Sequence, residues 1–245
     1  MKAPRFKSPV LLAPELAGQA IELHESAAHH AVRVLRLAVG DALTLFDGTG
    51  GEYAATLVRI DKRGASVRVE RFLAIERESH LAVTLAQGIA ANDAMDYAVR
   101  KATELGVTSI QPLVTARSAP FPPGERGDKR LAHWRGVAIA ACEQCGRNRV
   151  PEVFPSRPLV EWLDAWRGSG ILFAPDSDRS VMTLAQPPAP LALLIGPEGG
   201  FDARELAAAR ARKFHAARLG PRVLRTETAA VAGLSVLQSL WGDWR

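Results

Sequence analysis

From residue 81 onward, short apolar runs alternate with helical segments, and this alternation constrains the fold more than any other feature of the chain. The runs are LAVTLAQGIA (81–90), VTSIQPLV (107–114), GILFA (170–174) and LALLI (191–195), and each is typical of a buried strand. Strands separated by helices favour a mostly parallel sheet with both faces covered. We therefore expect an α/β domain over residues 80–245.

One helix of this domain, NDAMDYAVRKATELG (92–106), carries recognisable end signals. Asn92 or Asp93 is expected to cap its start, and Gly106 is expected to end it. A later helix, DARELAAARARKF (202–214), is expected to begin with Asp202 as its cap.

Residues 1–75 follow a different pattern. The stretches DALTLFDG (41–48), GEYAATLVRI (51–60) and GASVRVERFLAI (64–75) alternate apolar and polar residues and are separated by turn sequences. They predict a small β-rich domain. The charged stretch ERESH (76–80) is a plausible linker to the second domain.

The charge and hydropathy of the chain limit its location and partners. The net charge is +5, and most of the positive charge is arginine. Arginine suits phosphates and stacks on bases, which favours RNA, although an arginine-rich composition also follows from genome base content. No apolar run reaches the eighteen or so residues needed to span a membrane, and the first residues lack a signal-peptide core. We expect a cytoplasmic protein with no membrane partner.

The two cysteines, Cys142 and Cys145, form a single C-x-x-C motif. Such a motif is compatible with half of a zinc site or with a redox pair. The chain has no second motif of this kind, and the surrounding segment is helical in pattern. Buried thiols are the favoured interpretation, and no metal is expected.

Two loops near the C-terminus, IGPEGGF (195–201) and LGPRVLRTETA (219–229), each place a Gly-Pro pair directly after an apolar run. In an open α/β sheet such loops lie at the carboxyl edge, where ligands bind. Glycines let the backbone approach a ligand closely. The first loop has no P-loop lysine, and its Glu198 would oppose phosphate, so an adenine or ribose is a better fit. A glycine-rich turn without a ligand is the alternative.

Together with these loops, five further segments carry a resemblance to a known family. They are HHAVRVLRLAVGD (29–41), FDGTG (46–50), KATELGV (101–107), TARS (115–118) and EQCGRNRVP (143–151). The set resembles the SPOUT methyltransferases, and most closely the 16S rRNA (uracil-1498-N3)-methyltransferase family. The resemblance covers nearly the whole chain, in order.

The resemblance implies a fold, a cofactor and an assembly. The fold is a SPOUT α/β trefoil-knot domain with a parallel sheet, preceded by a PUA-like RNA-binding domain, and the protein is a homodimer. The two Gly-Pro loops lie side by side in the knot and clasp S-adenosylmethionine. The residues expected to line that site are Phe173, Ala174, Ile195, Gly196, Pro197, Gly199, Gly200, Leu219, Gly220, Leu224 and Thr226.

The implied reaction moves the methyl group to N3 of a uridine in 16S rRNA of the small ribosomal subunit. Because neutral N3 carries a proton, a base or a cation is needed, and Glu198, Arg225 and Glu227 are the candidates, with Glu198 and Arg225 favoured. Binding of the target phosphate is the alternative role for Arg225, and a backbone hydrogen bond that stabilises its own loop is the alternative role for Glu198. Glu227 lies at a helix start, where capping is the alternative role. The residues expected to bind RNA are Arg36, Arg117, Gln144, Arg147 and Arg149.

Two other classes of function compete with a methyltransferase. One is a catalytically inactive RNA-binding factor in ribosome assembly, against which the intact GPEGG and LRTET loops argue. The other is a nucleotide-binding enzyme with a Rossmann-like sheet, which would be expected to carry its glycine fingerprint early in the chain. Cofactor titration distinguishes a methyltransferase from both of these alternatives.

Overall fold

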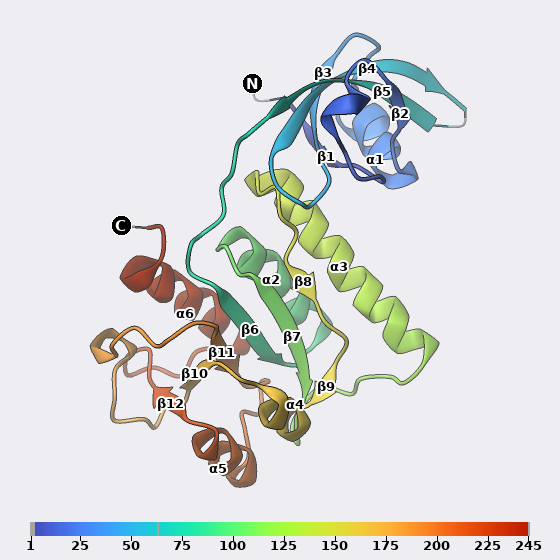
Figure 1. Cartoon of the computed structure of the whole chain (residues 1–245). Helices are drawn as coiled ribbons and strands as arrows, with labels where there is room; N and C mark the ends of the chain where they lie inside the picture. Colours follow the sequence, from blue (N-terminus) through green and yellow to red (C-terminus); the bar gives the residue numbers. More distant parts are fainter. Residues whose placement is uncertain (1–2, 63, 245) are drawn as a thin grey trace. The chain divides into compact units, whose positions relative to one another are not determined.

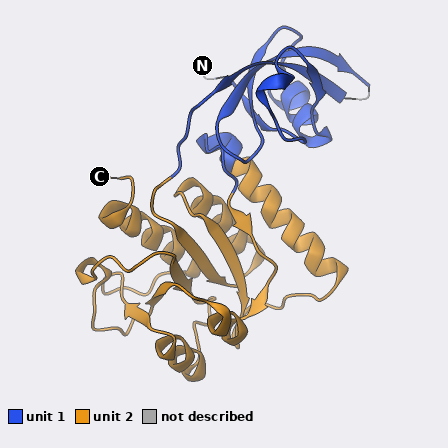
Figure 2. Ribbon diagram, viewed as in Figure 1, with its two compact units in different colours: residues 1–78, 142–150 blue, residues 79–141, 151–245 orange. Residues whose placement is uncertain are grey.

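The computed structural model describes residues 3–62 and 64–244 (Figure 1). The chain divides into two compact units (Figure 2). The first contains residues 1–78 and 142–150, and the second contains residues 79–141 and 151–245. The division predicted from the sequence, 1–75 and 80–245, does not include the return of residues 142–150 to the first unit.

The first unit is built on a five-stranded sheet with the order β1-β3-β4-β5-β2. Its strands are β1 (Arg5–Lys7), β2 (Ala20–Glu22), β3 (Ala42–Phe46), β4 (Glu52–Asp61) and β5 (Gly64–Leu73). All neighbouring strands are antiparallel except β1 and β3. A short helix, α1 (Glu25–His29), continues into one π-helical segment (His30–Val34). The three longer strands confirm the β-rich prediction.

Residues 142–150 are fixed to the first unit by buried polar contacts. Arg147 Nη2 lies 2.5 Å from Glu78 Oε2. Asn148 donates from Nδ2 to the Ile75 carbonyl and accepts from Arg5 Nη2, each at 2.6 Å. Because buried polar groups are costly unless they are paired, these contacts fix the segment in one place.

The C-x-x-C motif lies at the end of α3 (Glu125–Cys145), in the part of the helix that belongs to the first unit. Cys142 is buried and Cys145 is half-buried, and neither forms a disulfide. Burial raises the pKa of the Cys142 thiol to about 12. That thiol therefore stays protonated at neutral pH, and the thiolate is the form that binds metals or attacks disulfides.

The second unit contains a sheet in which all paired strands are parallel, and this confirms the predicted α/β class. The order is β12-β10-β11-β6-β7-β8, and β9 also pairs with β7. Its strands are β6 (Val83–Gly88), β7 (Ser109–Val114), β8 (Glu152–Val153), β9 (Arg157–Pro158), β10 (Ser169–Phe173), β11 (Leu191–Ile195) and β12 (Phe214–Ala217). The trefoil knot is consistent with this order and stays a prediction.

Helices cover both faces of this sheet. Helices α4 (Leu159–Ala165) and α5 (Ala203–Ala211) pack on one face, around a core that includes Trp162, Leu172 and Phe214. Helices α2 (Asn92–Glu104) and α6 (Thr226–Trp241) pack against each other, and α6 also contacts β11. Among the helices of the described ranges, none is both long enough and apolar enough to cross a bilayer.

The predicted helix caps have different outcomes. Asp202 caps α5 as expected, in a capping box with Glu205. The prediction for α2 was wrong, because its N-cap is Ala91 rather than Asn92 or Asp93. No side chain of the helix itself caps this end. The backbone is already helical at Asn92, so Asn92 and Asp93 lie inside the first turn and not before it.

Candidate functional site: a cleft at the carboxyl edge of the parallel sheet

A cavity of about 1070 Å³ lies in the second unit, where β6, β10, β11 and β12 end. The strand order places β11, which comes late in the chain, directly beside β6, which begins this unit. Ligands bind at such points, outside the carboxyl ends of parallel strands. The volume is just above the range of roughly 300–1,000 Å³ that is usual for small-molecule sites.

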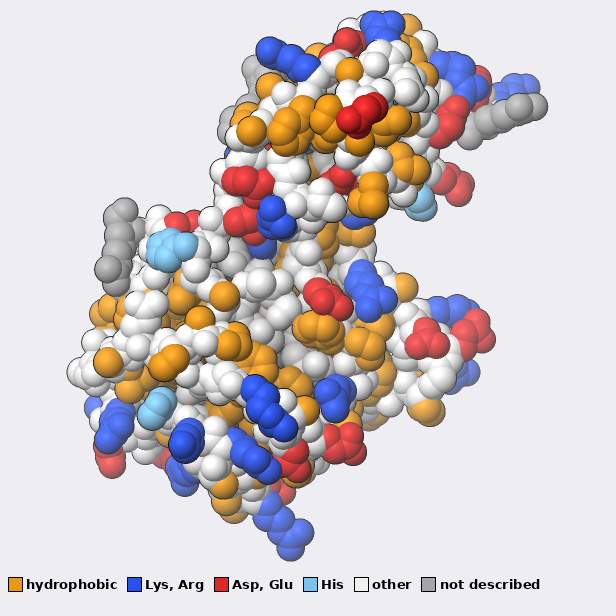
Figure 3. All heavy atoms as spheres, viewed as in Figure 1, with side chains coloured by type: hydrophobic (Ala, Val, Ile, Leu, Met, Phe, Trp, Pro, Cys, Tyr) orange, Lys and Arg blue, Asp and Glu red, His pale blue; other side chains and the backbone are white. Residues whose placement is uncertain are grey.

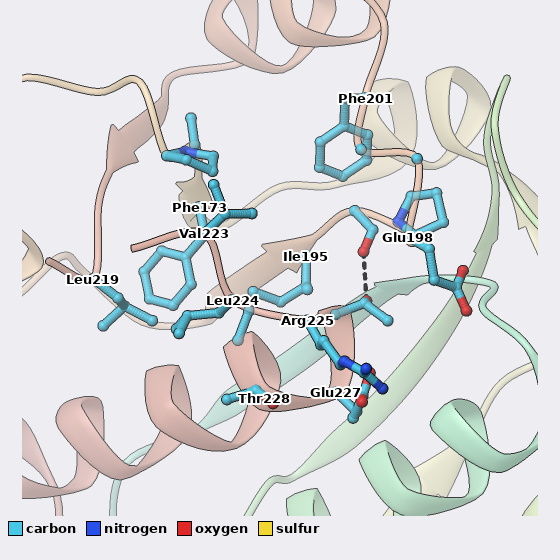
Figure 4. Close-up of a pocket in the computed structure, with 18 of the residues that line it drawn as sticks. Phe173, Ile195, Glu198, Phe201, Leu219, Val223, Leu224, Arg225, Glu227 and Thr228 are labelled. Carbon is cyan, nitrogen blue, oxygen red and sulfur yellow. Dashed lines mark hydrogen bonds between the residues drawn. The ribbon is translucent and has the colours of Figure 1, made fainter. Parts of the chain in front are cut away.

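The walls of the cavity differ in polarity. Phe173, Leu219 and Leu224 gather on one side (Figure 4). Glu198, Arg225 and Glu227 lie on the other side (Figure 4). An apolar wall opposite a few polar groups is the usual composition of a site for an organic ligand.

Every residue expected to hold the cofactor lines this cavity, and so do both catalytic candidates. Their contacts with a cofactor or substrate stay predictions, but the structure brings them together from three strand ends. The thirteen residues are Phe173, Ala174, Ile195, Gly196, Pro197, Glu198, Gly199, Gly200, Leu219, Gly220, Leu224, Arg225 and Thr226.

A buried hydrogen-bond network joins the two Gly-Pro loops. Thr226 Oγ1 donates to the Gly196 carbonyl at 2.6 Å. Gln87 Nε2, at the end of β6, donates to Thr226 Oγ1 at 2.8 Å and to the Gly88 carbonyl at 2.9 Å. Gln87 is 1% exposed and Thr226 is 5% exposed. Because these bonds are shielded from water, they hold the ends of β6 and β11 and the start of α6 in one arrangement.

Glycine is required at two kinds of position around the loops. Gly200 and Gly220 have φ values of +67° and +83°, a region that favours glycine. Gly88 faces Pro197, and a Cβ atom added there would lie 2.6 Å from Pro197 Cδ. The strand β6 and the first loop can therefore approach each other closely only because residue 88 has no side chain.

Glu198 is tied to the start of α2. Its Oε1 accepts a hydrogen bond from the Ala91 N–H at 2.8 Å. A carboxylate at this position satisfies one of the free N–H groups of the helix and interacts favourably with its dipole. Glu198 thereby supplies an acceptor for the N–H of the N-cap residue, which no side chain of α2 supplies.

The residues predicted to bind RNA do not lie in one place. Arg117 lines the cavity, and its Nη1 donates to the Gly199 carbonyl at 2.9 Å. Arg36, Gln144 and Arg149 are exposed and belong to the first unit, as does the buried Arg147. Arg147 is only 4% exposed and pairs with Glu78, so direct contact with RNA would require that pair to open.

Sequence reasoning missed one wall of the cavity and part of its rim. Ala91, Asp93, Ala94 and Tyr97 come from the loop after β6 and the first turns of α2. The signal was available, because the loop after a parallel strand next to β11 must lie at the same edge of the sheet. The remaining lining residues are Pro175, Asp176, Phe201, Leu206, Ala217, Arg218, Arg222, Val223, Glu227, Thr228 and Ala229.

Comparisons with known proteins agree with this architecture. Residues 77–238 match the family described as an RNA methyltransferase domain, and residues 23–70 match an RNA methyltransferase PUA domain. Ribosomal RNA small subunit methyltransferase E of Buchnera aphidicola is 31% identical, over 92% of each chain. The enzyme of the same description from Mycobacterium bovis is 32% identical, over 88% of this chain and 84% of its own.

Two solved structures share the whole fold. A Legionella pneumophila methyltransferase in complex with the bound cofactor S-adenosylmethionine has a TM-score of 0.94 and 38% identity, covering 99% of this chain and 100% of its own. Ribosomal RNA small subunit methyltransferase E of Neisseria gonorrhoeae, bound to S-adenosylmethionine, has a TM-score of 0.91 and 36% identity, covering 100% of both chains.

The parallel sheet, the cleft at its carboxyl edge and the matched families together define an RNA methyltransferase. Its preceding β-rich unit is the PUA domain that accompanies such enzymes. Within this class, the chain belongs to the ribosomal RNA small subunit methyltransferase E family.

Proposed function

We propose that this protein transfers a methyl group from S-adenosylmethionine to N3 of a uridine in 16S rRNA of the small ribosomal subunit. The observation that carries the proposal is the convergence of both Gly-Pro loops on one cavity, in a chain 36% identical to a family member bound to S-adenosylmethionine. The substrate places the reaction in the cytoplasm. We further propose that the enzyme acts as a homodimer.

The residues of the cavity fit S-adenosylmethionine. Phe173, Leu219 and Leu224 offer an apolar surface for the adenine. Within the described part of the chain, the backbone N–H groups of Leu219 and Leu224 donate no hydrogen bond, so both are available to adenine nitrogens. When bound, the cofactor supplies an electrophilic methyl group. The protein's main contribution is then to hold two reactants in line.

Proton removal from N3 is the chemical problem that the protein must solve. We assign Arg225 to stabilise the negative charge that develops on the uracil oxygens, and Glu198 to accept the N3 proton. Both side chains lie on the polar side of the cavity (Figure 4). Glu198 Oε1 is engaged by Ala91, whereas Oε2 forms no hydrogen bond to any described residue. Oε2 is therefore the oxygen available for the proton.

The RNA would be held by positive charge at the rim and by the first unit. Arg117, Arg218, Arg222 and Arg225 are exposed and line the cavity. Figure 3 shows further Lys and Arg side chains gathered on the face of the second unit that carries α4 and α5. Charge of this kind binds phosphates and makes affinity depend on salt. We assign Arg36, Gln144 and Arg149 to the same task in the first unit, with Arg147 holding the segment of Gln144 and Arg149 in place.

A methyl-transfer assay tests the proposal. Small subunits from a strain that lacks the protein are incubated with the enzyme and labelled S-adenosylmethionine, and the labelled nucleosides are identified. We expect 3-methyluridine. A different methylated nucleoside would retain the enzyme class and overturn the N3 assignment. No transfer together with no binding of S-adenosylmethionine would overturn the proposed reaction and favour an assembly factor.

A further inference from the structure

The carboxylate of Glu205, in the first turn of α5, is shared between two segments of the second unit. Its Oε2 accepts the Asp202 N–H at 2.9 Å, as part of the capping box of α5. Its Oε1 accepts the Ala116 N–H at 2.8 Å, from the loop that follows β7. Glu205 is 7% exposed, and no ion pair to it is found in the described ranges.

The second of these bonds is not needed for the helix. Asp202 Oδ1 accepts the Glu205 N–H at 2.8 Å, so the capping box is complete without Ala116. A buried carboxylate without a cationic partner is costly unless its oxygens are hydrogen-bonded. One of the two oxygens accepts a hydrogen bond from the 115–118 turn. The buried Glu205 therefore fixes this turn in place.

Arg117 is the residue that the turn presents to the cavity. Thr115 and Ser118 close the turn, because the Thr115 N–H donates to Ser118 Oγ at 2.9 Å and the Ser118 N–H donates to the Thr115 carbonyl at 3.2 Å. Beyond the turn, Arg117 Nη1 donates to the Gly199 carbonyl. A Cβ atom added to Gly199 would lie 2.9 Å from Arg117 Cβ, so this arginine rests directly on the first Gly-Pro loop.

Arg117 is exposed although its backbone and one nitrogen are fixed. Its Nε and Nη2 donate to no other residue of the described chain, which leaves one side of the guanidinium open. A preorganised guanidinium with free N–H groups suits a phosphate oxygen. The arginine loses less side-chain freedom on binding than an unrestrained surface arginine would.

We propose that Glu205 is a positioning residue, which holds the 115–118 turn so that Arg117 meets a phosphate of the RNA beside the target nucleotide. The inference rests on the proposed function, because it requires RNA to approach this cavity. It goes further by giving a role to a buried residue that does not line the cavity.

Steady-state kinetics with a matched pair of variants test the proposal. Glu205→Ala removes both acceptors, whereas Asp202→Ala removes the cap side chain of the same helix and leaves the Ala116 bond. The KM for small-subunit RNA and the Kd for S-adenosylmethionine are measured for both variants, with thermal unfolding alongside. Glu205→Gln, which keeps the shape and one acceptor oxygen, is the second variant if Glu205→Ala does not fold.

We expect Glu205→Ala to raise the KM for RNA about tenfold, the size of one lost charge-assisted hydrogen bond. The Kd for the cofactor changes less than about threefold. Asp202→Ala lowers the melting temperature without this change in the KM for RNA. Arg117→Ala should raise the KM for RNA to a similar extent. The Glu205→Ala, Arg117→Ala double variant should have the same KM for RNA as Arg117→Ala alone, because both substitutions remove the same contact with the RNA.

Two results would overturn the inference. One is an equal rise in the KM for RNA in Asp202→Ala and Glu205→Ala, which would mean that only the helix start matters. The other is additive losses in the double variant. The wild-type protein in the same assay reports separately on the proposed function. If it transfers no methyl group, filter binding of small-subunit RNA to the same variants still tests the positioning role.

Discussion

The hydroxyl of Thr226 donates a 2.6 Å hydrogen bond to the carbonyl of Gly196. These two residues belong to the two Gly-Pro loops, and Gln87 from a third strand end donates to the same hydroxyl. The wall of the cavity is therefore held by a buried side chain rather than by the loops alone. A loop that is fixed before the cofactor arrives loses less entropy on binding.

Thr226→Val tests this link. The substitution keeps the shape of the side chain but removes both buried hydrogen bonds of the hydroxyl, which leaves only a 3.5 Å bond from Gln87 Nε2 to the Gly196 carbonyl. We expect a loss of about 1–3 kcal/mol in the free energy of unfolding. The affinity for S-adenosylmethionine, measured by calorimetry, should fall roughly tenfold. Thr226→Ser keeps the hydroxyl and should restore most of both, whereas equal losses in the two variants would exclude the hydrogen bond as the cause.

Gly88→Ala tests the close approach of β6 to the first loop. The added methyl group meets Pro197 at 2.6–2.7 Å, and a proline ring cannot move aside as a flexible side chain can. We expect a cost of about 1–3 kcal/mol and a displaced loop with weaker cofactor binding. Gly136→Ala in α3 is the control, since nothing lies within 4 Å of its added Cβ. That change should stabilise the protein by about 0.5–1 kcal/mol. Unchanged cofactor affinity in Gly88→Ala would refute the argument.

Arg225→Ala tests the catalytic assignment. Arg225 is exposed at the start of α6, so its loss should not disturb the core. We expect kcat to fall by a factor of about 10²–10³, as when one stabilising donor of a developing charge is removed. The Kd for S-adenosylmethionine should change less than about threefold. Arg210→Ala, on an exposed position of α5 away from the cavity, should leave kcat unchanged. Turnover like that of the wild type in Arg225→Ala would remove this residue from the mechanism.

Glu143 provides a prediction about pH. Burial raises the pKa of its carboxyl above 4.5, and the hydrogen bond from Lys7 and the positive charges of His30, Arg5 and Lys7 offset this only in part. The folded state therefore binds the proton more tightly than the unfolded state. Its contribution to stability is present below pH 4.5 and is lost as the pH rises through the raised pKa.

Glu143→Gln should remove this loss of stability at higher pH. The amide oxygen still accepts the Lys7 N–H, and the side chain stays neutral at every pH. Compared with the wild type, the variant should melt at a higher temperature at pH 7.5 and at a similar temperature at pH 4.5. The exposed Glu152→Gln is the control and should show no such difference between the two pH values. A Glu143→Gln variant less stable than the wild type at pH 7.5 would contradict the prediction.

The strands and helices of the second unit were predictable because their signals are local. Continuous apolar runs predicted β6, β10 and β11, and Asp202 predicted the start of α5. The short strands β1, β2, β8 and β9 have only two or three residues each, too few to show a period. Their places are decided by pairing with strands far away in the chain.

The remaining differences between the predicted and the observed structure come from contacts between distant segments of the chain. Ala91 is the N-cap of α2 and has no polar side chain, and its N–H is bonded by Glu198 from the loop after β11. Residues 142–150 join the first unit because Arg147 meets Glu78 and Asn148 meets Ile75, although the helical pattern continues unbroken to Cys145. The positions of the cavity-lining loops were predictable from the edge rule for parallel sheets. The buried position of the Arg147 side chain was not predictable, because its partner Glu78 is 69 residues away in the chain.

Nucleoside mass spectrometry of cellular rRNA would show whether this protein methylates N3 of a uridine in 16S rRNA, as we propose. Mature 16S rRNA is digested from a strain that lacks the gene, from the same strain with the wild-type gene restored, and from one carrying Arg225→Ala. We expect that 3-methyluridine is lost on deletion, returns with the wild-type gene and does not return with the variant. Undiminished 3-methyluridine in the deletion strain, or the loss of a different methylated nucleoside, would contradict it.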